Sequence, residues 1–277
     1  MSLKQNNLDD RTFLLGVGAQ KAGTSWLYRY LRAHPEIYMS PIKEMHFFGN
    51  RNSDKCWPMP YFRKKLRMRQ KLNPEKNLSA LTDRIEMKDD ISKYIDFFQS
   101  RLKEQTVFGE ITPLYCALDV TELKYIKSRF PSTKVIFILR NPADRLWSQM
   151  RFSGATKTAK DLTKSPNEIY NKPQYLIRSD YSSTIQNLQQ VFLPQNIHYE
   201  FYETLFCTKA IKRICTFLNV GYVPARFNRM YNISNKVRLS MEHRQILVDL
   251  LRDQYEFVFE KFGDRVPESW KVDVQRP

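Results

Sequence analysis

Little in the sequence points to membrane insertion, secretion or zinc binding. No apolar run reaches the ~20 residues of a membrane-spanning helix, and the polar first residues lack the hydrophobic stretch of a signal peptide. The four cysteines are scattered, with none of the C-x-x-C spacing that is typical of a zinc site. These absences favour reduced thiols and a cytoplasmic protein, although a domain trimmed from a luminal protein would look the same.

Acidic residues are outnumbered, because 29 Asp and Glu stand against 45 Lys and Arg and leave a formal net charge of +16. This charge implies an anionic partner, whether nucleic acid, acidic glycan, membrane surface or phosphorylated cofactor. A hydrophobic content of 42% with 13% aromatic residues is typical of a globular protein. We expect a single domain over 1–277, with 1–10 disordered and 49–90 forming an insertion or flexible loop region.

The apolar segments alternate between strand-like and helix-like patterns. Strands are expected at 13–17, 37–39, 106–111, 134–139 and 196–202, and helices at 26–33, 91–98, 121–130, 176–193, 210–218 and 241–262. The run at 134–139 is continuously apolar, as a parallel strand covered on both faces requires. The chain is therefore predicted to be an α/β protein, with a central, mainly parallel sheet flanked by helices as in P-loop nucleotide kinases.

Residues 13–27 have the pattern of a buried strand, a tight glycine-rich turn and the start of a helix. The first amides of such a helix have no partner within it and attract an anion. Lys21 adds a positive charge, and Thr24 and Ser25 add hydroxyl groups. This stretch is predicted to bind a phosphate.

The spacing from Gly18 to Gly23 approaches the P-loop of nucleotide triphosphatases, but the lysine is misplaced. That motif has Lys directly after its second Gly, whereas here Thr24 holds that position and Lys21 comes two residues before Gly23. A glycine-rich turn can also be only a tight connection between a strand and a helix. A second site is needed to decide.

The strand at 134–139 supplies a candidate for that second site. Asn141 suits a helix cap and Pro142 the first helical position, so Arg140 stands at the carboxyl end of a parallel strand, where α/β sheets bind ligands. Ser148 follows two turns into the helix, and a guanidinium with a nearby hydroxyl suits a phosphate. A triphosphatase would need an acidic residue here for Mg²⁺. The two sites therefore favour a nucleotide phosphorylated in two places and bound without a metal.

Two further segments carry charge of possible use in catalysis or recognition. Glu44 and His46 lie two residues apart; in an extended segment both would point to one face and could act as a general base and its orienting partner. The alternative is a surface Glu beside a His packed on Phe47 and Phe48. The basic run at 63–71 is either a solvated face or a positive lip for an acidic acceptor.

These segments resemble the sulfotransferase superfamily that uses 3′-phosphoadenosine 5′-phosphosulfate (PAPS), and they are most similar to its heparan sulfate and carbohydrate branch. Residues 20–26, Gln-Lys-Ala-Gly-Thr-Ser-Trp, resemble the 5′-phosphosulfate loop. Arg140 and Ser148 resemble the 3′-phosphate pair. Residues 43–48, Lys-Glu-Met-His-Phe-Phe, resemble the segment that carries the proposed base of the carbohydrate branch.

The resemblance implies transfer of a sulfuryl group from PAPS to an acceptor hydroxyl, on a carbohydrate or glycoconjugate, by in-line displacement and without a metal. The catalytic residues that it implies are Lys21, Glu44 and His46. The cofactor-binding residues that it implies are Gln20, Lys21, Ala22, Gly23, Thr24, Ser25, Trp26, Arg140, Ser148, Tyr181, Lys236 and Arg238. Lys236 and Arg238 fall in a stretch that resembles the loop closing over the cofactor phosphates, or is an ordinary basic loop.

One position departs from the family pattern. The glycan branch has Glu-Lys-Ser/Thr-Pro at the second strand end, where this chain has Glu-Ile-Thr-Pro at 110–113. The lysine is thus replaced by Ile111, which counts against a heparan-type acceptor and a second catalytic Lys but not against cofactor binding.

Two other classes of protein fit parts of the pattern. A kinase that uses ATP and Mg²⁺ on a small molecule or nucleotide could employ the same glycine-rich loop. A nucleic-acid-binding protein would explain the net charge, but it leaves the loop and Arg140 without a purpose. The sulfotransferase hypothesis expects a hydroxyl-bearing acceptor and no nucleic acid.

Overall fold

The computed structural model of the chain describes residues 8–49, 59–72, 78–153, 172–228 and 239–275. Its centre is a five-stranded sheet in the order β2-β3-β1-β4-β5. The strands are β1 (Thr12–Gly18), β2 (Ile37–Met39), β3 (Val107–Ile111), β4 (Thr133–Leu139) and β5 (Ile197–Phe201). Every neighbouring pair is parallel, which confirms the α/β class and the parallel sheet.

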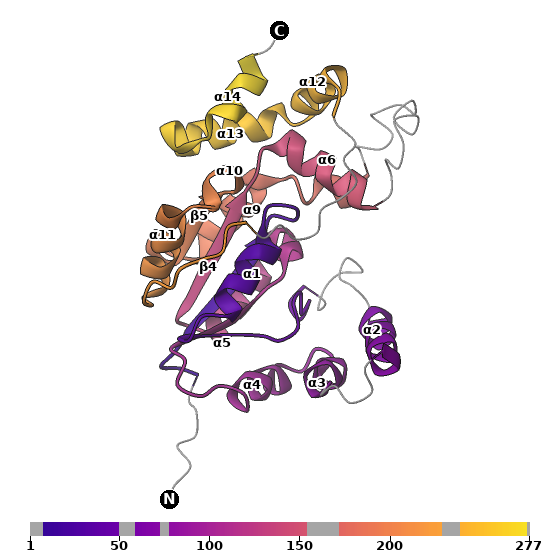
Figure 1. The fold of residues 1–277 in the computed structure, drawn as a ribbon, viewed down its shortest axis with the longest axis vertical. Coiled ribbons are helices and arrows are strands. Elements are labelled where there is room, and N and C mark those ends of the chain that lie inside the picture. The colour runs from indigo at the N-terminus through magenta and orange to yellow at the C-terminus, as the bar shows by residue number, and fades with distance from the viewer. Residues whose placement is uncertain (1–7, 50–58, 73–77, 154–171, 229–238, 276–277) are drawn as a thin grey trace, which may run out of the picture.

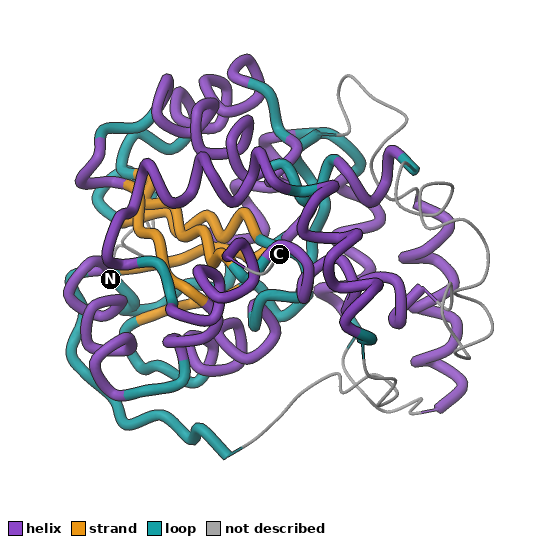
Figure 2. Tube along the Cα trace, turned by 90° about the horizontal axis from the view of Figure 1, so that it is seen from above, coloured by secondary structure: helices purple, strands orange, loops and turns teal. Residues whose placement is uncertain are grey.

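Helices enclose this sheet on both sides, as Figure 2 shows from above. In Figure 1, α1 lies in front of the sheet, α2, α3 and α4 form a row near the N-terminus, and α12, α13 and α14 gather at the opposite end. The helices are α1 (Thr24–Arg32), α2 (Met59–Leu72), α3 (Ser79–Met87), α4 (Ile91–Gln99), α5 (Val120–Arg129), α6 (Pro142–Ser153), α8 (Pro173–Leu176), α9 (Tyr181–Val191), α10 (Tyr202–Leu205), α11 (Thr208–Leu218), α12 (Met241–Leu250), α13 (Arg252–Phe262) and α14 (Glu268–Gln275). Within the residues described, none of them is both long and apolar enough to cross a membrane.

The first strand is the central strand, and its neighbours come from much later in the chain. Thr12 pairs with Val107 of β3, and Phe13 with Thr133 of β4. The carboxyl ends of these three strands therefore meet at one edge of the sheet. The segments that follow β1, β3 and β4 are brought together there, as expected for ligand binding in α/β sheets.

The region 49–90 was expected to be an insertion or flexible loop, but its described parts contain two helices. Phe62 of α2 and Leu81 and Met87 of α3 are buried in the core. The many charged residues of α2 leave only a narrow apolar face, so its helical periodicity was not recognised in the sequence. Within 1–10, Leu8 is buried; residues 1–7 lie outside the described part.

Two long helices expected from the sequence are each divided. The segment 176–193 breaks before α9, where Asp180 caps the new helix by accepting a hydrogen bond from the Ser183 amide at 2.9 Å. The segment 241–262 breaks at Leu251, whose backbone (φ −109°, ψ 16°) departs from the helical conformation and whose side chain turns into the core.

The last helix braces the end of β4. Asp273 of α14 accepts hydrogen bonds from the Asn141 side chain at 2.9 Å and from Arg244 at 2.6 Å. Asn141 in turn caps α6, since its side-chain oxygen accepts from the Asp144 amide at 3.2 Å. The cap and Pro142 as first helical residue confirm the sequence prediction, whereas α14 was not predicted.

Candidate active site

The loop after β1 leads directly into α1. Gly18 and Gly23 take positive φ values of 145° and 81°, and Lys21 takes 69°. A Cβ on Gly23 would lie 3.1 Å from a methyl carbon of Leu205, so glycine allows α10 to approach the loop. No side chain in the described part of the chain caps α1 at Thr24. The positive end of the helix dipole at this uncapped terminus favours an anion.

Lys21 lies in a cluster of positive charges. Burial, followed by the charges of Arg140 and Arg151, lowers the pKa of Lys21 to about 8, and Glu44 opposes this shift. The Lys21 ammonium lies 4.4 Å from the centre of the Phe152 ring. Among the described residues it forms no ion pair. An anion bound nearby would stabilise the charged form of Lys21.

Arg140 joins the two segments that the sequence predicted to bind phosphate. Its guanidinium donates a hydrogen bond to the carbonyl oxygen of Lys21 at 2.7 Å and stacks on Tyr202, 4.5 Å from the ring centre. The backbone of Arg140 is held by the buried Tyr181 hydroxyl. The structure therefore places Tyr181 as a support for Arg140.

Ser148 lies on α6 one turn before Arg151 and Phe152, so the three share a face of that helix. Ser148 is 5% exposed. Arg151 acts on the pKa of Lys21, and Phe152 contacts the Lys21 ammonium. This face of α6 therefore lies against residues 19–23, the loop between β1 and α1 that the sequence predicts to bind phosphate (the phosphate loop). The sequence reasoning missed Arg151 and Phe152, although their spacing from Ser148 would have indicated them.

The other residues that were predicted to bind phosphate fall into two groups. Some have polar side chains beside the loop, and the others have side chains that pack in the core. Gln20 has a buried side-chain oxygen without a hydrogen-bond partner among the described residues. Ala22 and Trp26 are buried, and Trp26 stacks on Phe227 with ring centres 5.8 Å apart while its indole NH donates to the Arg226 carbonyl at 3.2 Å. Thr24 is also buried and Ser25 is half-buried. Lys236 and Arg238 lie outside the described residues.

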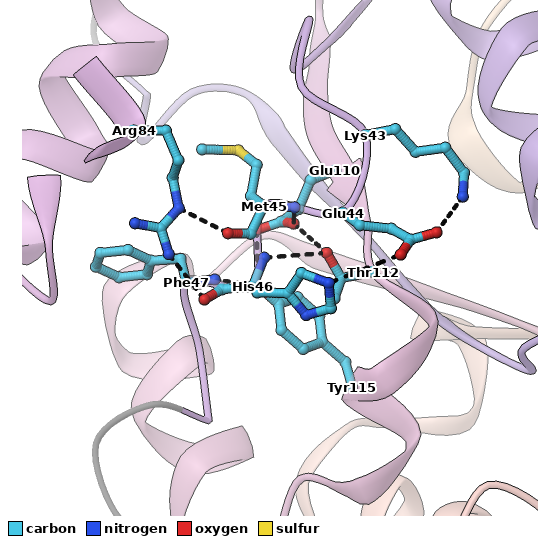
Figure 3. A network of polar contacts seen from close by, with 9 residues as sticks. All are labelled: Lys43, Glu44, Met45, His46, Phe47, Arg84, Glu110, Thr112 and Tyr115. Carbon is cyan, nitrogen blue, oxygen red and sulfur yellow. Dashed lines mark hydrogen bonds and ion pairs between the residues drawn. The ribbon is translucent and has the colours of Figure 1, made fainter. Parts of the chain in front are cut away.

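Glu44 and His46 converge, but not on an extended segment. Both residues take left-handed backbone conformations, with φ of 62° and 48°, so the segment is not extended and strand alternation does not explain why the two side chains meet. Their side chains still meet: Nε2 of His46 is 3.7 Å from Oε2 of Glu44, while the Lys43 ammonium binds Oε1 (Figure 3). The carboxylate is held between a cation and an imidazole.

The Glu44 carboxyl is ionised over a wide pH range. Burial alone would raise its pKa, but the neighbouring His46 side chain and the charge of Lys43 outweigh burial and lower the pKa to about 2. Its side chain is 36% exposed, whereas that of His46 is 4% exposed. The Glu44 carboxylate is thus accessible from solvent, whereas its imidazole partner is buried. The segment therefore has features of both interpretations, the base with an orienting partner and the surface Glu beside a packed His.

Cations from distant segments also face Glu44. Burial lowers the pKa of Arg178 and of Lys65, and the negative charge of Glu44 opposes this shift in both. Lys65 comes from α2, the helix of the basic run. Arg178 precedes α9 and was missed, because no local pattern marks it.

Comparison with known proteins identifies the family. A family model described as "Sulfotransferase family" matches residues 14–224. The chain belongs to the sulfotransferase family. No curated protein matches it significantly.

Solved structures share the fold of this sulfotransferase-family enzyme at low identity. A sulfotransferase from Alicyclobacillus acidocaldarius has a TM-score of 0.66 and 19% identity, covering 94% of this chain and 99% of that one. STF9 from Mycobacterium avium has a TM-score of 0.53 and 10% identity, covering 93% and 78%. The sulfotransferase domain of the Synechococcus PCC 7002 olefin synthase has a TM-score of 0.50 and 18% identity, covering 77% and 74%.

The position that departs from the glycan branch lies in the core of the enzyme. Ile111 is 1% exposed and fills the space beside Gly16, where a Cβ would lie 2.5 Å from the Ile111 Cγ1. Its neighbour Glu110 is completely buried and accepts hydrogen bonds from four donors. Ile111 has no charge and the Glu110 carboxylate is enclosed by its four donors, so neither residue supplies a charge to the phosphate loop.

Proposed function

We propose that the enzyme transfers a sulfuryl group from PAPS to a hydroxyl of a carbohydrate or glycoconjugate. The observation that carries this proposal is the hydrogen bond from Arg140 to the Lys21 carbonyl. It brings the cation at the end of β4 beside the anion site of α1. Two adjoining sites of this kind suit a nucleotide phosphorylated at both its 5′ and 3′ positions.

The residues present fit such a donor. The amides at the start of α1 and the Lys21 ammonium would bind the 5′-phosphosulfate, and the side-chain NH2 of Gln20 is a further potential donor. Arg140 and Ser148 would bind the 3′-phosphate, and Tyr181 would act by holding Arg140. PAPS supplies a sulfuryl group on a phosphate leaving group. The roles of Lys236 and Arg238 at these phosphates stay predictions.

Lys21 and the α1 amides would stabilise the negative charge that develops on the leaving phosphate. Lys21 is suited to this because burial and its neighbouring cations disfavour its charge until an anion arrives. Fixed cations would thereby do the work that Mg²⁺ does in kinases. Glu110, the carboxylate near the end of β3, is enclosed by four donors and is not placed to hold a metal ion.

Glu44 would accept the proton of the acceptor hydroxyl, with His46 orienting the carboxylate. A pKa of about 2 makes Glu44 a weak base in the absence of ligands. Negative charge bound beside Lys21 and Lys43 would offset their attraction and raise the pKa of Glu44. The base would thus gain strength when the donor is bound.

The acceptor is proposed to carry negative charge of its own. The basic residues of α2 are Arg63, Lys64, Lys65, Arg67, Arg69 and Lys71, and no acidic residue interrupts them. None of these cations forms an ion pair within the described residues. Lys65 is half-buried beside Tyr61 and faces Glu44. An acidic group on the glycan would complement these charges and place a neighbouring hydroxyl near the base.

The test is calorimetric titration with 3′,5′-adenosine bisphosphate (PAP), compared with ATP plus Mg²⁺. We expect micromolar binding of PAP, weak binding of ATP, and at least tenfold loss of PAP affinity in Arg140→Ala. Arg213→Ala, which removes an arginine bound to Glu200 on β5, is the control and should bind PAP normally. A preference for ATP with Mg²⁺ would replace this proposal with the kinase alternative.

A further inference from the structure

A buried cation and a buried anion hold the two sides of one residue, Met45. Arg84 of α3 and Glu110 of β3 both have 0% exposure. Nε of Arg84 donates to the Met45 carbonyl oxygen at 2.6 Å, and the Met45 amide donates to Oε2 of Glu110 at 3.2 Å (Figure 3). Met45 is the residue between Glu44 and His46, so the charges act directly on the backbone that carries both side chains.

Further hydrogen bonds extend this hold along the segment. Arg84 also donates to the His46 carbonyl oxygen at 2.8 Å. The Tyr115 hydroxyl donates to Oε1 of Glu110 at 3.0 Å and accepts from the amides of Phe47 and Phe48 at 2.9 and 3.2 Å. Consecutive peptide groups from Met45 to Phe48 are therefore bound by side chains of β3, α3 and the segment after β3.

Glu110 itself is surrounded by donors. Its two oxygens also accept from the hydroxyls of Thr112 at 2.6 Å and Tyr94 at 2.9 Å. Burial raises the pKa of Glu110, and these hydrogen bonds oppose that rise. Four donors match the acceptor sites of an ionised carboxylate. The four donors therefore favour the ionised form of Glu110, whereas its burial favours the neutral form.

Packing alone does not require this arrangement. A buried charge is costly unless it is paired and fully hydrogen-bonded, and an apolar core of the same volume is usually as stable. The backbone at Glu44 and His46 is left-handed, a conformation that residues other than glycine adopt only where the surroundings hold them. The hydrogen bonds from Arg84 and to Glu110 provide that restraint at the place where the two left-handed residues flank Met45.

We propose that Arg84 and Glu110 are positioning residues, which fix the Met45 peptide groups so that the Glu44 carboxylate and the His46 ring face the transferred group together. This inference rests on the proposed function of Glu44 and His46. Arg84 also lies 5.0 Å from the ring centre of Phe62 on α2. The helix with the proposed acceptor-binding cations is thereby packed against the residue that places the base.

The experiment compares Arg84→Gln, Arg84→Lys and Glu110→Gln with the wild-type enzyme. Glu200→Gln is the matched control, because Glu200 is also buried and bound by an arginine but lies on β5. Amide hydrogen exchange is measured by mass spectrometry on the peptide that covers 43–48. We expect at least tenfold faster exchange there in Arg84→Gln and Glu110→Gln, a smaller change in Arg84→Lys, and none in the phosphate loop or in the control. PAP affinity should stay within twofold.

Titration of Glu44 gives a readout that a purely structural role would not move. The groups that face Glu44 are Lys43 and His46 on its own segment, Lys21 on the phosphate loop, Tyr61 and Lys65 on α2, and Arg178. In Arg84→Gln the His46 contact should loosen and the pKa of Glu44 should rise by at least one unit in ¹³C NMR, assigned with Glu44→Gln. Arg84→Lys should restore part of the shift. Unchanged exchange at 43–48 together with an unchanged Glu44 titration would overturn the proposal.

Turnover of PAPS with an acidic oligosaccharide acceptor completes the test. We expect Arg84→Gln to lower kcat about 10- to 100-fold with little change in KM for PAPS, and to cause no further loss in a Glu44→Gln background, because both act through the same base. An equal loss in both backgrounds would contradict positioning. If the wild-type enzyme neither binds PAP nor turns over PAPS, the proposed function fails, whereas exchange and titration still decide what Arg84 and Glu110 hold.

Discussion

The hydroxyl of Tyr181 binds both backbone groups of Arg140. It donates to the Arg140 carbonyl oxygen at 2.6 Å and accepts from the Arg140 amide at 3.3 Å. The tyrosine is 1% exposed and belongs to α9, which follows β4 in the chain by some forty residues. The end of β4 is therefore fixed by a residue that presents its ring to the core and its hydroxyl to the peptide.

Tyr181→Phe removes these two hydrogen bonds without changing the charge of the site. Each such bond contributes about 1 kcal/mol, so we expect PAP affinity to fall about 3- to 30-fold as Arg140 becomes less well placed. Calorimetry measures this change. Tyr199→Phe on β5, whose hydroxyl has no hydrogen-bond partner among the described residues, should bind PAP as the wild type does. Equal affinities for the two variants would contradict the supporting role.

Glu44→Gln should remove the proposed base while keeping the shape of the side chain. We expect kcat to fall about 10²- to 10⁴-fold, the usual contribution of general base catalysis, with PAP affinity nearly unchanged. Initial rates of PAP release and calorimetry measure the two effects. Glu104→Gln, on an exposed residue before β3, provides the control. Loss of PAP binding in Glu44→Gln would move Glu44 out of the base role.

Deprotonation of Lys21 should lower the activity of the enzyme at alkaline pH. Its pKa in the free enzyme is lowered to about 8, so it loses its positive charge as pH rises through that value. We expect kcat/KM for PAPS to fall on the alkaline side of about pH 8. Lys21→Arg, which keeps its charge in this range, should abolish that limb even if its rate is lower. A limb that persists in Lys21→Arg would assign it to another group.

Introducing the lysine of the glycan branch at position 111 should destabilise this protein. Ile111→Lys would bury an unpaired ammonium against Gly16, at a cost of about 3–5 kcal/mol in the free energy of unfolding. Ile111→Val is the control, with an expected cost of about 1 kcal/mol. Chemical denaturation measures both. A stable and more active Ile111→Lys enzyme would show that this position still faces the reaction.

The charge on the acceptor can be tested on α2. Lys65→Gln should raise KM for a sulfated or carboxylated oligosaccharide about 5- to 20-fold and leave PAP affinity unchanged, because Lys65 is the half-buried cation that faces Glu44. Arg67→Gln, on the exposed side of the same helix, should have a smaller effect. A neutral oligosaccharide used equally well by all three enzymes would argue against an acidic acceptor.

The parts of the molecule that could be predicted are those with strong local signals. The apolar strands, the glycine-rich turn and the Asn141-Pro142 helix start each depend on a few neighbouring residues, and together they place Arg140 beside the phosphate loop. Asp180 was also a readable helix cap, but it was overlooked within an apolar pattern. The division at Leu251 has no glycine or proline to mark it.

The remainder depends on tertiary contacts. The left-handed backbone of Glu44 and His46 could not be inferred from residues that normally avoid it, so only an extended segment was considered as the way to bring the pair together. In the sequence, nothing distinguishes Arg84 from the other charged residues of its polar region. Its hydrogen bonds to the Met45 and His46 carbonyl oxygens are seen only in the folded chain. Arg178 approaches Glu44 through packing between segments far apart in sequence.

The strand order has a consequence for how the chain is made. β1 is synthesised first, yet its partners β3 and β4 follow roughly a hundred residues later, and long-range parallel pairing is intrinsically slow. At about 5–20 residues per second, β1 waits several seconds on the ribosome with both edges open. A translational pause or a truncation before β4 would leave an apolar strand exposed to other chains, so soluble yield should depend on where synthesis stalls.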